Sequence, residues 1–163
     1  MQLKIKKATK DDFQTIQKLN FLLFKKEQKD FDNTLKINWP FTTEGEKYFQ
    51  YLMESNNGQV WLALVDGEPV GYLAGKIKSD TPSSRKIKKR AVLDNMFVLP
   101  DFRNRGIGGK LVKEFIKWTS LKKVDNIRVT AFAKNSSAIN FYKKYGFQEY
   151  NLTLEVNKSS NEE

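Results

Sequence analysis

The chain has 163 residues, of which 39% are hydrophobic and 13% aromatic, which is enough for one globular domain with a real core. Cysteine and histidine are both absent, which excludes disulfides, thiol nucleophiles, Ser-His-Asp triads and most zinc sites. The 29 Lys and Arg residues outweigh 19 Asp and Glu, and the formal net charge of +10 favours either an anionic partner or a solvated lysine-rich surface.

No apolar run approaches the roughly 20 residues of a membrane span, and residues 1–10 contain no hydrophobic signal segment. We therefore expect a cytoplasmic protein without membrane association. We also expect one domain over residues 1–158, followed by a flexible tail at residues 159–163.

The first third of the chain predicts a strand followed by two helices. Residues 3–6 alternate as a strand does, and Thr9 with Asp12 resembles a capping box at the start of the first helix. The apolar residues of that helix are Phe13, Ile16, Leu19, Leu23 and Phe24. Residues 30–41 are irregular in pattern, since Trp39 precedes a proline that ends any helix there.

The remaining elements follow from periodicity and turn residues. A second helix covers residues 43–55, and strands at 60–65 and 70–77 flank the hairpin turn Asp66-Gly67-Glu68-Pro69. After these, the sequence predicts a strand at residues 91–98, a helix at 105–121 and a strand at 127–132. A further helix at 135–144 would be capped by Asn135 and ended by Gly146, and a final strand would cover 147–156.

The most informative segment is residues 98–110, VLPDFRNRGIGGK, in which closely spaced glycines lead from an apolar strand into a helix. Gly106, Gly108 and Gly109 fall in the first turn, where backbone N–H groups have no helical partner and the helix dipole is positive. Because glycine carries no side chain, a phosphate can approach these N–H groups closely. The segment therefore predicts a site for a phosphorylated cofactor.

The glycine spacing does not fit two common phosphate-binding motifs. A P-loop requires glycine at position 104 and Ser or Thr at 111, and a dinucleotide fingerprint requires glycine at 111, but the chain has Asn104 and Leu111. The segment instead contains Arg-x-x-Gly-x-Gly from Arg103 to Gly108. Residues 135–147, NSSAINFYKKYGF, add Asn-x-x-Ala, Phe-Tyr and Gly-Phe in order. In both segments the chain resembles the GNAT superfamily of N-acetyltransferases.

The resemblance covers nearly the whole chain and implies an α+β fold (three-layer α/β). The sheet would be mixed and mostly antiparallel, with six to seven strands and about four helices on its two faces. Residues 1–158 would form a single N-acetyltransferase domain that uses acetyl-CoA as acetyl donor and no metal. The acetyl group would pass to a primary amine by direct attack in a ternary complex.

The resemblance leaves the acceptor open among small-molecule and protein amines: polyamines, aminoglycosides, amino acids, other small amines, and protein N-termini or lysines. Relatives often dimerise, so a homodimer is also left open.

The resemblance assigns the cofactor contacts to three groups of residues. The coenzyme diphosphate is expected at Arg103, Asn104, Arg105, Gly106, Ile107, Gly108, Gly109 and Lys110. The pantetheine arm is expected along the preceding strand, at Met96, Phe97 and Val98, and at the later helix, at Asn135, Ser137, Ala138, Phe141 and Tyr142.

The resemblance also suggests the groups that move protons. Tyr142 matches a tyrosine near the coenzyme sulfur and would protonate the departing thiolate. The backbone N–H of Phe97 or Val98 would stabilise the oxyanion. Asp94 lies where many relatives carry a glutamate facing the acceptor and is the candidate general base, with Glu149 or a water as alternatives.

Two other functions are weighed against this one. A basic nucleic-acid-binding module would account for the net charge and for the cluster at residues 85–90, RKIKKR, but no nucleic-acid motif is present and both segments above would stay unexplained. A nucleic-acid partner is therefore not expected. The other alternative keeps the fold but not the catalysis, as a coenzyme-A-binding regulator.

Overall fold

The computed structural model describes residues 1–158, which form two compact units, residues 1–130 and residues 131–158. The tail expected at residues 159–163 lies outside the described residues. The expectation of one domain over residues 1–158 stays a prediction.

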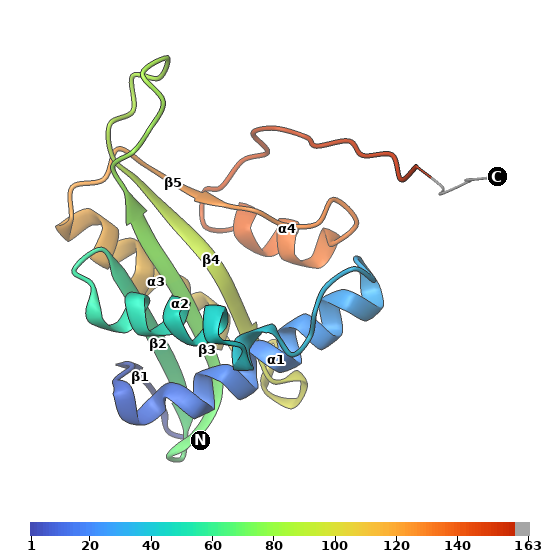
Figure 1. Ribbon diagram of the computed structural model, residues 1–163. Helices are drawn as coiled ribbons and strands as arrows, with labels where there is room; N and C mark the ends of the chain where they lie inside the picture. The colour runs from blue at the N-terminus through green and yellow to red at the C-terminus, as the bar shows by residue number, and fades with distance from the viewer. Residues whose placement is uncertain (159–163) are drawn as a thin grey trace. The chain divides into compact units, whose positions relative to one another are not determined.

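The first unit is built on a five-stranded sheet in which neighbouring strands follow chain order (Figure 1). The strands are β1 (Leu3–Lys7), β2 (Gly58–Val65), β3 (Glu68–Lys78), β4 (Arg90–Val98) and β5 (Asn126–Val129). β1 to β4 pair antiparallel and β5 runs parallel to β4, so the expected mixed, mostly antiparallel sheet is confirmed. The predicted hairpin turn is also confirmed, with positive φ at Asp66 and Gly67.

Helices cover both faces of this sheet (Figure 1). The α-helices are α1 (Phe13–Asp30), α2 (Thr43–Glu54) and α3 (Ile107–Leu121), and the 3-10 turns are η1 (Lys10–Asp12), η2 (Trp39–Phe41) and η3 (Pro100–Phe102). Trp39 and Pro40 thus form a short turn within the segment expected to be irregular. α3 begins two residues later than expected, because Gly106 has a left-handed φ of 78° that no helical residue adopts.

The core lies on both sides of the sheet. On one face α1 and α2 contribute Ile16, Leu19, Leu23, Phe49 and Leu52, which pack on Val60, Leu62, Tyr72, Ala74 and Phe97 of the strands. On the other face the rings of Trp61, Phe115 and Trp118 pack within 5.6–6.1 Å of one another. A Cβ added at Gly75 would lie 2.4 Å from the Phe115 ring, so α3 can pack this closely only on a glycine.

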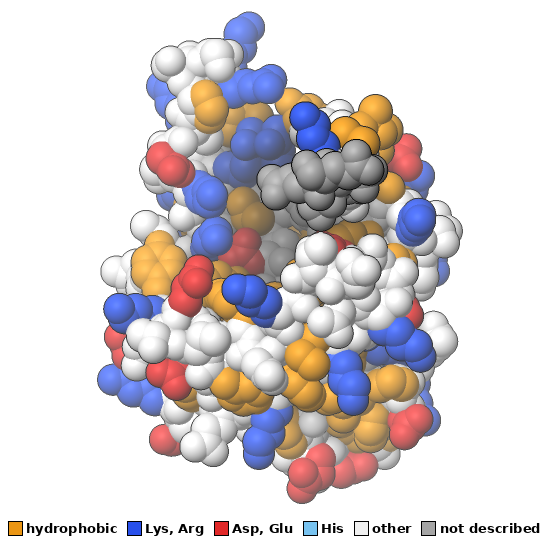
Figure 2. All heavy atoms as spheres, turned by 45° about the vertical axis from the view of Figure 1, so that its right-hand side comes forward, with side chains coloured by type: hydrophobic (Ala, Val, Ile, Leu, Met, Phe, Trp, Pro, Cys, Tyr) orange, Lys and Arg blue, Asp and Glu red, His pale blue; other side chains and the backbone are white. Residues whose placement is uncertain are grey.

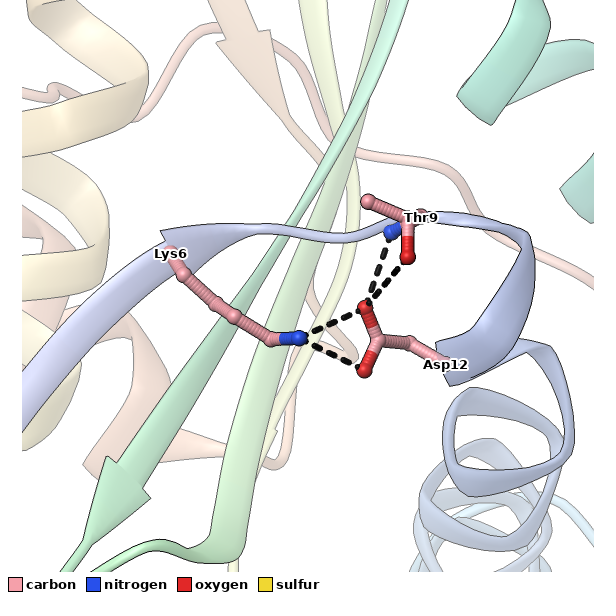
Figure 3. Close-up of polar contacts among 3 residues, drawn as sticks. All are labelled: Lys6, Thr9 and Asp12. Atoms are coloured by element: carbon pink, nitrogen blue, oxygen red, sulfur yellow. Dashed lines mark hydrogen bonds and ion pairs between the residues drawn. The ribbon is translucent and has the colours of Figure 1, made fainter.

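The junction between β1 and α1 is fixed by one carboxylate (Figure 3). Asp12 accepts hydrogen bonds from the Thr9 N–H at 2.8 Å and from Lys6 Nζ at 2.8 and 2.9 Å, which confirms the predicted cap. Partial burial disfavours the charge of Asp12, but the bonds from Lys6 and Thr9 outweigh it and lower the pKa of Asp12. This carboxylate therefore stays ionised and holds the strand to the helix.

The second unit contains α4 (Ser136–Lys143), whose N-cap is Asn135 as predicted: its side chain accepts a bond from the Ala138 N–H at 3.1 Å. Gly146 follows the helix with φ 88°, as expected for a residue that ends it.

The strand expected at residues 147–156 is absent from this unit, so the described residues contain five strands rather than six to seven. Tyr150, Leu152, Leu154 and Val156 alternate along this segment, but these residues are 61–85% exposed. Alternation makes a strand only where a neighbour pairs with its backbone, and none of the described strands pairs with this segment.

No helix among the described residues is both long enough and apolar enough to cross a bilayer.

Candidate functional site

The glycine segment forms a tight loop between β4 and α3. After η3 the chain reverses through two left-handed residues, Asn104 with φ 59° and Gly106 with φ 78°. The first bond of the helix runs from the Lys110 N–H to the Gly106 carbonyl, at 3.1 Å. The N–H groups of residues 107–109 therefore precede the helical hydrogen bonds and lie at the positive end of the helix, as predicted for an anion site.

Arg103 is held against the end of β4. Its Nε donates to the Val98 carbonyl at 2.9 Å, and its guanidinium carbon lies 5.3 Å from the centre of the Phe97 ring. Arg105 lies over the Phe102 ring at 5.6 Å and is exposed. Arg103 is thus a positioned cation, whereas Arg105 lies at the surface.

The second half of β4 has an open edge. β5 pairs with β4 only from Arg90 to Leu93, so beyond Leu93 no described strand lies along that side. The Leu99 N–H donates to the Val70 carbonyl on β3. Along a strand, the N–H groups of successive residues point alternately toward and away from the neighbouring strand. The N–H of Phe97 therefore points to β3, while those of Met96 and Val98 point away from it. Of the two expected oxyanion donors, only Val98 has its N–H on the open side.

A β-bulge sets the direction of Asp94. Ala74 pairs with Asn95 and Gly75 pairs with Leu93, so Asp94 is an extra residue on β4. A bulge of this kind turns two consecutive side chains to the same face. Asp94 and Asn95 consequently both reach Tyr48 of α2.

A chain of hydrogen bonds fixes this pair of side chains. The Tyr48 hydroxyl donates to Asp94 Oδ2 at 2.7 Å and accepts from Asn95 Nδ2 at 3.2 Å. Tyr72 donates to Asn95 Oδ1 at 2.7 Å, and Asn20 Nδ2 donates to Tyr72 at 2.8 Å. The chain runs from the fully buried Asn20 of α1 to the partly exposed Asp94, so the core positions the carboxylate.

Lys76 of β3 completes the surroundings of Asp94. Its Nζ lies 3.0 Å from Asp94 Oδ2 and 5.6 Å from the centre of the Tyr48 ring. Burial and the charge of Asp94 both raise the pKa of Tyr48, so its hydroxyl keeps its proton and remains a donor. Asp94 therefore has one hydrogen-bond donor and one cation as fixed partners.

The other predicted site residues lie in the second unit. Asn135 caps α4, while Ser137, Ala138, Phe141 and Tyr142 lie within that helix. Tyr142 is buried, with its ring 5.2 Å from that of Phe141 and 5.6 Å from that of Phe147. Glu149, the alternative base, has a side chain that is 76% exposed and lies 3.4 Å from Lys143 Nζ.

Sequence reasoning missed Tyr48, Lys76 and Asn95 as site residues. Tyr48 counts as apolar in the periodicity of its helix, although its hydroxyl is polar. Lys76 offered a signal, since it is the one charged residue within the expected strand at residues 70–77. Within the described part of the chain, no group of three or more metal-binding side chains comes together.

Comparison with known proteins decides the family. Residues 22–147 match the model of the acetyltransferase (GNAT) family. The chain belongs to this family. It is also 31% identical over 148 residues to the uncharacterized N-acetyltransferase MJ1207 of Methanocaldococcus jannaschii, covering 89% of this chain and 60% of that relative. The predicted family and the predicted enzyme class, an N-acetyltransferase, are confirmed.

Solved structures confirm the GNAT fold. A mutant of the BH1408 protein from Bacillus halodurans superposes with a TM-score of 0.84 at 18% identity, covering 96% of this chain and 99% of that one. The aminoglycoside N-acetyltransferase AAC(6')-Iy, in complex with CoA, gives 0.76 at 18% identity, covering 96% and 95%. The α+β class expected for this GNAT member is therefore correct, with fewer strands than expected.

Proposed function

We propose that this chain is an acetyl-CoA-dependent N-acetyltransferase that transfers the acetyl group to a primary amine by direct attack in a ternary complex. One observation on residues 1–158 carries the proposal: the N–H groups that precede the helical hydrogen bonds of α3 follow closely after β4, and no described strand pairs along the second half of β4 on the β5 side. The first feature suits a diphosphate and the second suits an extended arm that bonds to a strand.

The diphosphate would bind the N–H groups of residues 106–109, with Arg103 and Lys110 supplying positive charge. Met96 and Val98 would offer main-chain groups to the pantetheine arm. Asn135, Ser137, Ala138 and Phe141 of α4 are assigned to the coenzyme by resemblance. Support comes from the CoA complex of the structurally similar aminoglycoside acetyltransferase.

The chemistry requires a neutral amine, because an ammonium with a pKa near 10.4 has no lone pair for attack. The Val98 N–H would donate to the oxyanion, a contribution of a few kcal/mol in other acyl transfers. Tyr142 would protonate the leaving thiolate. Asp94, Glu149 and a water remain the candidates for the group that accepts the amine proton. With Lys76 and Tyr48 as partners, Asp94 is suited to hold the amine and to pass its proton through a water.

The test is a calorimetric titration with acetyl-CoA, together with thiol release on a panel of amines. Gly108→Trp should abolish coenzyme binding, because an indole would fill the space in front of the first-turn N–H groups. Lys113→Trp adds the same ring to an exposed position further along α3 and should bind normally. Undiminished affinity in Gly108→Trp would refute the diphosphate site. Binding without thiol release on any amine would favour the non-catalytic regulator.

A further inference from the structure

The amine acceptor has a second recognition group available besides Asp94. Lys76 Nζ lies 3.0 Å from Asp94 Oδ2, and the two side chains are only 26% and 14% exposed. Both positions are fixed, since Lys76 also lies over the Tyr48 ring and Asp94 receives the Tyr48 hydrogen bond. The site therefore presents one negative and one positive charge side by side.

This pairing suits some amines better than others. A simple ammonium gains the attraction of Asp94 but meets the repulsion of Lys76, and a polycation meets more of it. Both Lys76 and Tyr48 contact Oδ2, and no bond to Oδ1 is found within residues 1–158. Oδ1 is thus the carboxylate oxygen open to a new cation.

We propose that Lys76 and Asp94 together bind an acceptor that carries a carboxylate next to its amine, as an α-amino acid does; this rests on the proposed function. In an α-amino acid the nitrogen and the nearer carboxylate oxygen can lie about 3 Å apart, since only three bonds join them. Lys76 Nζ lies 3.0 Å from Asp94 Oδ2, and Oδ1 belongs to the same carboxylate, so the charges of the internal ion pair have a comparable separation. The two pairs can therefore form a square of alternating charges, with the ammonium at Asp94 Oδ1 and the carboxylate at Lys76 Nζ.

This arrangement also explains why a lysine can be favourable in a site that binds an amine. Alone, Lys76 weakens the binding of any ammonium at Asp94. With a carboxylate on the substrate it contributes a charge-assisted bond instead. Selectivity then arises from repulsion of plain amines as much as from attraction of amino acids.

The experiment compares matched trios of acceptors in a thiol-release assay with acetyl-CoA: an α-amino acid, its amide, and the amine lacking the carboxyl group. Several aliphatic and aromatic trios are used, because the side-chain preference is not specified by the pair. In the unmodified protein kcat/KM should be at least about tenfold higher for the acid than for the amide in the preferred trio. Lys76→Met should remove that preference for the acid and raise kcat/KM for the plain amine. Lys76→Arg, which keeps the positive charge, should retain much of the preference.

Lys78→Met is the matched control, since Lys78 is an exposed residue two positions along the same strand. It should leave the preference of every trio unchanged. The proposal is overturned if amides or plain amines equal the acids in all trios, or if Lys76→Met slows all three acceptors alike. Transfer to plain amines as fast as to the acids in every trio would overturn it and leave the acetyltransferase function standing. Acetyl-CoA binding without transfer to any amine would instead overturn both.

Discussion

Tyr48 is the side chain on which the position of Asp94 most directly depends. Tyr48→Phe removes the 2.7 Å bond to Asp94 and leaves the ring and its packing in place. A hydrogen bond to a charged group contributes about 1.5–3 kcal/mol, so we expect kcat/KM to fall roughly tenfold or more. Steady-state kinetics with acetyl-CoA and the best acceptor measure this. Tyr51→Phe, an exposed residue on the same helix, should change nothing, and equal losses in both variants would contradict the assignment.

Tyr142 offers a second residue-scale test, since Tyr145 lies just beyond the end of α4 and the rings of both tyrosines contact that of Phe141. Tyr142→Phe should lower kcat about 10- to 100-fold while acetyl-CoA affinity persists, because a phenyl ring cannot protonate a thiolate. Tyr145→Phe, which has no assigned role, should retain kcat. Calorimetry and single-turnover thiol release separate binding from chemistry. Unchanged turnover in Tyr142→Phe would remove it from the mechanism.

For single residues, the sequence predicts those whose role is set by local backbone conformation or by a short motif, such as Gly106 and Asn135. It does not predict partners brought together across elements. Tyr48, Lys76 and Asp94 come from a helix and two strands, and their contact depends on one extra residue in β4. Nothing in the local pattern of residues 90–98 marks that bulge.

Among the elements, the junction of β1 and α1 gives a prediction for stability. Because the pKa of Asp12 is lowered in the folded chain, its contribution is complete above the ordinary carboxyl value of 3.8. The contribution is lost as pH falls through the lowered folded value. Asp12→Asn should therefore reduce the free energy of unfolding by about 1 kcal/mol at pH 7 and by little at pH 2. Urea unfolding at the two pH values measures the difference.

The neighbouring Asp11 is an exposed carboxylate in the same turn and serves as the control. Asp11→Asn should reduce stability less than Asp12→Asn at pH 7. A loss for Asp12→Asn of the same size at both pH values would show that the carboxylate charge is not what fixes the junction.

Elements with strong periodicity and clear caps are predictable from the sequence. α2 and α4 begin within one residue of the predicted positions, and α1 differs only in that its first turn is the 3-10 helix η1. Element ends were less so, because they depend on backbone conformation: Gly106 delays α3 until residue 107. The failed strand at residues 147–156 shows the remaining gap. A period of two reports that one face is apolar, but strand formation needs a partner whose position is not encoded locally.

For the whole molecule, the net charge of +10 is the feature with two interpretations. Lys and Arg side chains are spread over the face drawn in Figure 2 rather than gathered in one patch. In the cluster at residues 85–90, the backbone N–H groups of Lys88 and Lys89 donate to Asp125, and Lys89 Nζ donates to the Lys122 carbonyl. Part of the cluster thus helps to hold its own loop in place.

The end of β4–β5 pairing at Leu93 has a consequence for how far the sequence can change in evolution. Peptide groups are common to all residues except proline, so a recognition surface made of them persists while the surrounding side chains change. Only Pro at 96 or 98 would delete a donor from it. If the proposed coenzyme site is correct, such a chain can diverge far in sequence, change its acceptor, and still bind the same acetyl donor.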